Sequence, residues 1–67
     1  MDEKQMAMYE GGASHASEVQ RNRALGLSWD DAEGVPPEKA MELAERDQQC
    51  GDDWGEAYWK GYLSRWD

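Results

Sequence analysis

The feature that most constrains this chain is the concentration of aromatic side chains near its C-terminal end. Five of the seven aromatic residues lie between residues 53 and 66. Read as a helix, with about 100° between successive residues, this segment places them on one broad stripe: Trp54, Tyr58, Trp59, Tyr62 and Trp66, with Leu63 beside them. Glu56, Lys60 and Ser64 occupy the opposite side. We therefore expect the last helix to form the centre of the fold, with the rest of the chain covering its aromatic face.

The length of the chain limits it to one small domain. In 67 residues, a hydrophobic core supplies only about 3–5 kcal/mol of stability. Cys50 is the only cysteine, which excludes an internal disulfide, and the single His15 cannot complete a structural zinc site with it. Dense packing of Trp and Tyr is therefore the expected source of stability.

Periodicity predicts an all-α, three-helix bundle-like domain with helices at about 2–24, 37–50 and 53–66, and a short turn near 29–33. Gly26 reads as the end of the first helix, and Pro37 is suited to the first position of the second. Asp53 with Glu56 resembles a capping box for the third helix. Ser28 with Asp31 has the same form and predicts the turn.

The first predicted helix has an unusually small apolar face at Gly12, Ala13 and Ala16. Glycine costs about 1 kcal/mol relative to alanine inside a helix, so the Gly11-Gly12 pair indicates close approach by a bulky neighbour. The aromatic stripe of the last helix is the expected neighbour. The alternative is that the glycine pair breaks or kinks the helix.

Negative charge is concentrated in the middle of the chain. The segment 30–56 contains ten acidic residues and two basic ones, which accounts for the net charge of −8. Affinity for nucleic-acid phosphates comes from Lys and Arg, so direct nucleic-acid binding is disfavoured and a basic partner is favoured. The alternative is that the acids serve only to keep the protein in solution.

The sequence contains no apolar run near the ~18 residues that span a bilayer. The first residues also lack the basic and apolar regions of a signal peptide. These observations predict a cytoplasmic protein with no membrane partner.

No arrangement of residues in the sequence indicates catalysis. Cys50 and His15 are the only nucleophile–base pair of the cysteine–histidine type, and no third residue is marked as an orienting group. His15 falls on the predicted polar side of the first helix and is expected to be a surface histidine. The acidic segments lack the calcium-loop pattern D-x-[DN]-x-[DN]-G. We therefore predict no enzymatic activity, no catalytic residue, no metal site and no cofactor.

The preferred functional hypothesis is a small acidic binding or inhibitor protein that presents carboxylates to a basic protein surface, such as that of a nucleic-acid-binding protein. The predicted contact residues are Glu38, Glu42, Glu45, Asp47, Asp52 and Asp53, with Trp59 and Trp66 as apolar anchors. In size and charge the chain is similar to phage-encoded inhibitors such as anti-CRISPR proteins and DNA mimics, an analogy that rests on no shared motif. The alternative is a structural or regulatory homo-oligomer, such as a homodimer, that associates through Trp59, Leu63 and Trp66.

Overall fold

The computed structural model describes residues 2–66 and contains three helices. They are α1 (Glu3–Ala24), α2 (Pro37–Gln49) and α3 (Asp53–Leu63). No strand occurs within residues 2–66, so the all-α prediction is confirmed for the part of the chain described. The third helix ends at Leu63, three residues before the predicted boundary, and Trp66 therefore lies beyond it.

Side-chain caps determine where two of the helices begin. Asp2 and Gln5 form a capping box at the start of α1, in which each side chain accepts from the other residue's backbone N–H at 2.8 Å. Asp52 caps α3 by accepting from the N–H of Gly55 at 2.9 Å. The prediction of Asp53 as the capping residue is wrong by one position, because Asp53 is already the first helical residue.

Glycine and proline mark three of the other four boundaries. α1 ends before Gly26, and α2 ends before Gly51, with φ angles of +96° and +76°. Left-handed backbone of this kind favours glycine because a Cβ atom would be strained there. Pro37 opens α2, where its missing N–H has no partner to lose.

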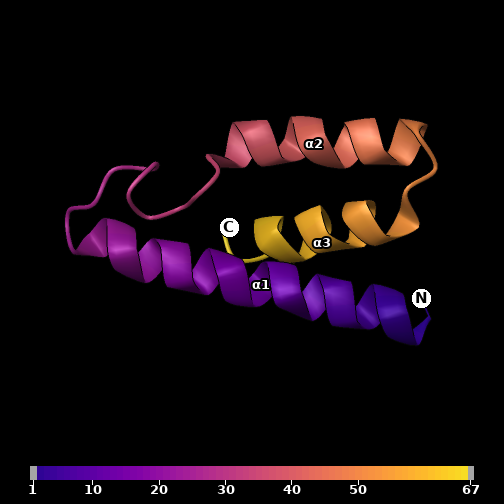
Figure 1. The fold of residues 1–67 in the computed structure, drawn as a ribbon, viewed down its shortest axis with the longest axis horizontal. Coiled ribbons are helices and arrows are strands. Elements are labelled where there is room, and N and C mark those ends of the chain that lie inside the picture. Colours follow the sequence, from indigo (N-terminus) through magenta and orange to yellow (C-terminus); the bar gives the residue numbers. More distant parts are fainter. Residues whose placement is uncertain (1, 67) are drawn as a thin grey trace.

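α3 is the central helix. It runs between α1 and α2, in the same direction as α1 and opposite to α2 (Figure 1). Both outer helices pack on α3, and within residues 2–66 the two outer helices do not pack on each other. The prediction that the rest of the chain covers the last helix is thus confirmed in its general form.

Glycine allows the backbones of α1 and α3 to come into direct contact. A Cβ atom on Gly12 would lie 1.9 Å from the carbonyl oxygen of Tyr58, and one on Gly61 would lie 1.9 Å from that of Tyr9. α1 runs unbroken past the glycine pair, so the alternative of a broken helix is wrong. The close neighbour of Gly12 is the backbone of α3 rather than an aromatic ring, and the ring of Tyr58 lies beside the exposed Gly11.

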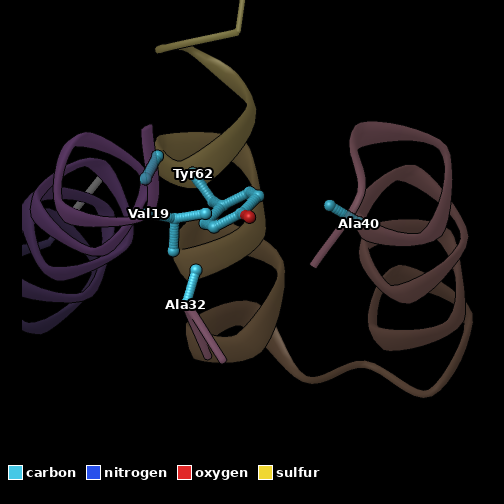
Figure 2. Packing of buried hydrophobic residues seen from close by; sticks show 5 residues of the cluster. Val19, Ala32, Ala40 and Tyr62 are labelled. Atoms are coloured by element: carbon cyan, nitrogen blue, oxygen red, sulfur yellow. The ribbon is translucent and has the colours of Figure 1, made fainter. Parts of the chain in front are cut away.

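One tyrosine forms the middle of the hydrophobic core. Tyr62 is fully buried, and the small side chains around it come from all parts of the fold: Ala16 and Val19 of α1, Ala32 of the connecting segment and Ala40 of α2 (Figure 2). Its hydroxyl accepts from the backbone N–H of Val35 at 2.9 Å and donates to the carbonyl of the same residue. These hydrogen bonds attach the α1–α2 connection to α3.

The connection itself contains the predicted turn. The hydroxyl of Ser28 accepts from the N–H of Asp31 at 3.1 Å, and the carbonyl of Ser28 accepts from the N–H of Ala32 at 2.9 Å. This turn places Ala32 in the core. Glu33 follows with a φ angle of +55°, a left-handed conformation that non-glycine residues seldom adopt.

Candidate partner-binding surface

Three carboxylates follow one another along the outer side of α2. Glu38, Glu42 and Glu45 are all exposed, and residues three or four apart are neighbours on a helix surface. Lys39 lies 3.7 Å from Glu42 in an exposed ion pair, which partly neutralises the middle of the row. We call Glu38, Glu42 and Glu45 the acidic row. The structure therefore brings together three of the four predicted contact residues that lie on the second helix.

Asp47 is not part of this surface, and the prediction that it presents charge to a partner is wrong. Only 8% of Asp47 is exposed. Its carboxylate lies against the first turn of α3, so close that a Cβ atom on Gly55 would be 2.2 Å from Oδ2. A negative charge at a helix N-terminus is stabilised by the helix dipole. Arg46 also contacts the carboxylate at 3.5 Å. These two interactions within the fold explain why the negative charge of Asp47 is buried.

Asp52 and Asp53 are exposed at the turn between α2 and α3. Asp52 has the capping role described above, while Asp53 carries charge in the first turn of α3. α2 and α3 run in opposite directions (Figure 1), so these residues lie at the far end of α2 from Glu38. They extend the negative surface beyond the acidic row.

A groove between α2 and α3 lies beside the acidic row. It has a volume of about 400 Å³ and is lined by Pro37, Met41, Lys60, Leu63, Ser64 and Trp66. Met41 is 55% exposed. Glu38 and Glu45 are three residues before and four residues after Met41, so they are its neighbours on the helix surface. The apolar groove thus adjoins two carboxylates of the acidic row, Glu38 and Glu45.

The predicted aromatic anchors occupy different positions. Trp66 is half-buried and lines the groove from the segment after α3. Trp59 is also half-buried, and both tryptophans pack against the core, but Trp59 does not line the groove. Trp59 makes edge-on contacts with Tyr58 and Tyr62, with ring centroids 5.1 and 5.6 Å apart. Trp54 is the most exposed of the stripe, at 47%. The expectation that the rest of the chain covers the aromatic face of the last helix is therefore wrong at Trp54.

His15 is not an ordinary surface histidine, which corrects the sequence-based expectation. It is half-buried, with Nε2 2.9 Å from the carbonyl oxygen of Glu33 and Nδ1 2.7 Å from the hydroxyl of Tyr58. A carbonyl oxygen can only accept, so Nε2 carries a proton. In the neutral tautomer with that proton on Nε2, Nδ1 accepts from the hydroxyl of Tyr58. The spacing of Gly12, His15, Ala16 and Val19 is that of one helix face, and this signal places His15 at the edge of the core.

Tyr58 and Tyr62, the tyrosines next to His15, remain protonated at neutral pH. Burial raises the pKa of Tyr58 above its ordinary value of 10.0, and the nearby Tyr62 raises it further. Burial also raises the pKa of Tyr62, while its hydrogen bond with Val35 and the indole of Trp66 oppose the rise. Both hydroxyls therefore keep their protons, and that of Tyr62 is the donor to the carbonyl of Val35.

The structure gives Cys50 and His15 separate surroundings. Cys50 is exposed at the end of α2, while both ring nitrogens of His15 are engaged by Tyr58 and Glu33.

Within residues 2–66, no group of three His, Cys, Asp or Glu side chains could hold a metal ion. In the same part of the chain, each helix is too short or too polar to cross a membrane.

No protein-family model, curated protein or solved structure matches the chain.

Proposed function

We propose that this protein is a non-enzymatic binding or inhibitor protein that presents its acidic row to a basic surface of another protein. The observation that carries the proposal is the placement of Glu38, Glu42 and Glu45 on one exposed side of α2, next to an apolar groove. A row that served only to keep the protein in solution would not need an apolar groove beside it.

The spacing of the row supports a comparison with nucleic acid. At about 1.5 Å of rise per residue, successive carboxylates of the row are separated by roughly 4.5–6 Å along α2. One DNA strand carries a phosphate about every 3.4 Å. A protein surface that recognises phosphates through Lys and Arg would also meet a row of negative charges on α2, although these charges are more widely spaced than phosphates. A nucleic-acid-binding protein is therefore the partner class that we favour, in the manner of DNA mimics and anti-CRISPR proteins.

The proposal can be tested with two variants of equal charge. The first carries Glu38→Lys, Glu42→Lys and Glu45→Lys, and the second carries Glu3→Lys, Glu10→Lys and Glu18→Lys on α1, where all three positions are exposed. Each triple substitution changes the net charge of −8 to −2. We expect a partner captured from cell lysate by the unmodified protein to bind the α1 variant but not the α2 variant, and to dissociate in high salt.

Retention of the same partner by the α2 variant would contradict the proposal. Self-association is the competing explanation, and sedimentation velocity separates the two. A dimer that dissociates on Trp66→Ala and is indifferent to the acidic row would favour the homo-oligomer instead.

A further inference from the structure

The groove between α2 and α3 offers an apolar site of defined size. Its apolar lining consists of Pro37, Met41, Leu63 and Trp66, and its volume of about 400 Å³ lies in the range of ligand pockets. Met41 is more than half exposed and is therefore accessible to a partner. Methionine is a flexible side chain that adapts readily to apolar partners. Lys60 also borders the groove, but its ammonium group lies 3.8 Å from Glu56 in an ion pair.

Charge around the groove indicates what kind of segment could occupy it. Glu38 and Glu45 adjoin Met41 on the α2 side, and the ion pairs described above involve neither of them. An occupant with apolar side chains on one face and Lys or Arg beside them would fill the groove and meet these two carboxylates. A second copy of this chain is a poor occupant because it brings its own net charge of −8, and like charges repel.

We propose that the α2–α3 groove binds an amphipathic basic helix of a partner protein, with its apolar face on Met41, Leu63 and Trp66 and its cations opposite Glu38 and Glu45. An amphipathic helix placed in a groove is a recurrent form of peptide recognition. The inference rests on the proposed function and deepens it, because it assigns both the anchor site and the shape of the segment that binds.

Methionine methyl groups provide a direct probe of this site. The protein is labelled with ¹³C at its methionine methyls and titrated with a synthetic helix that carries leucines at i, i+3, i+4 and i+7 and lysines elsewhere. Met41 lies in the groove, whereas Met6 and Met8 lie on α1. We expect the Met41 signal to shift and the signals of Met6 and Met8 to stay in place.

Two control peptides test the chemistry of the occupant. One has the same composition with its leucines dispersed around the helix, and the other has glutamates in place of the lysines. Both are expected to bind at least about tenfold more weakly, a difference of about 1.4 kcal/mol. Equal binding by either control peptide, or a leucine–lysine helix that leaves the Met41 signal unchanged, would overturn the inference.

Matched substitutions separate this inference from the proposed function. Met41→Lys places a cation in the groove, and Met6→Lys makes the same change on α1 at a residue of similar exposure, 52% against 55%. We expect Met41→Lys to weaken peptide binding about tenfold or more and Met6→Lys to leave it unchanged. Loss of binding on reversal of the acidic row, with Met41→Lys still binding normally, would refute the groove and retain the acidic surface. Formation of a dimer that buries Met41 would also refute the proposed occupant.

Discussion

Replacing Gly12 by alanine tests the backbone contact between α1 and α3. The new Cβ atom would lie 1.9 Å from the carbonyl oxygen of Tyr58 and 2.9 Å from the backbone nitrogen of Tyr62, whereas ordinary contacts begin near 3.4 Å. The helices would have to separate by roughly 1.5 Å at this point, the difference between 3.4 and 1.9 Å. No side-chain rotation can relieve the overlap because the obstructing atoms belong to the backbone.

The expected loss of stability combines two opposing effects. Overpacking of a well-packed interior costs about 1–3 kcal/mol, and a backbone obstruction places Gly12→Ala near the upper end. Alanine recovers about 1 kcal/mol through its higher helix propensity. The net loss is therefore about 2 kcal/mol, which lowers the Tm of a domain of this size by roughly 10 °C. Urea denaturation followed by circular dichroism measures the change in the free energy of unfolding.

The neighbouring glycine provides the matched control. A Cβ atom on Gly11 would meet only the ring of Tyr58, at 3.8 Å, so Gly11→Ala should gain helix propensity without an overlap and stabilise the protein by up to about 1 kcal/mol. Gly61→Ala should resemble Gly12→Ala, and the double substitution should cost less than the sum because one separation of the helices relieves both. If Gly12→Ala is as stable as Gly11→Ala, the described contact between α1 and α3 is wrong.

Further predictions concern buried polar groups. Tyr62→Phe leaves the backbone N–H and carbonyl of Val35 without their partner, so it should lower the free energy of unfolding by about 1–3 kcal/mol; an unchanged urea midpoint would contradict this. Because folding raises the pKa of Tyr58 and Tyr62 above the ordinary 10.0, their contribution to stability should be complete below pH 10 and decline as the pH rises through the folded-state pKa values. Stability that increases above pH 10 would argue against burial of these hydroxyls. Asp47→Asn should lower the free energy of unfolding by about 1 kcal/mol because it removes a negative charge at the start of α3. Glu45→Gln, measured in the same thermal melt, is the control that should leave stability unchanged.

The sequence was sufficient to predict the elements whose causes are local. Gly26 and Pro37 mark helix ends through their own backbone preferences, and the aromatic stripe identified α3 as the central helix. The small face around Gly12 predicted a close approach. It could not show that a backbone, and not a ring, makes that approach, because the reciprocal role of Gly61 depends on how the two helices cross.

The errors share a physical cause. The sequence pattern predicts Asp47 on the surface because acids in a helix are usually exposed, but the reversal of direction between α2 and α3 brings it beside the first turn of α3. The pattern of the first helix likewise predicts His15 on the polar surface, whereas its hydrogen-bond partners Glu33 and Tyr58 come from the connecting segment and from α3. The contacts of these two polar side chains come from elements distant in the sequence. The pattern of residues within one helix therefore cannot predict them.

The most direct test of the proposed function is the affinity of the basic amphipathic helix as a function of salt. Isothermal titration calorimetry compares the unmodified protein with a variant carrying Glu38→Gln, Glu42→Gln and Glu45→Gln, at low and at physiological ionic strength. Exposed charge interactions are screened over about 8 Å at physiological salt. We predict that the unmodified protein binds more tightly at low salt and that the variant binds weakly with little salt dependence. Equal affinities and equal salt dependence for the two proteins would show that the acidic row is not the contact surface.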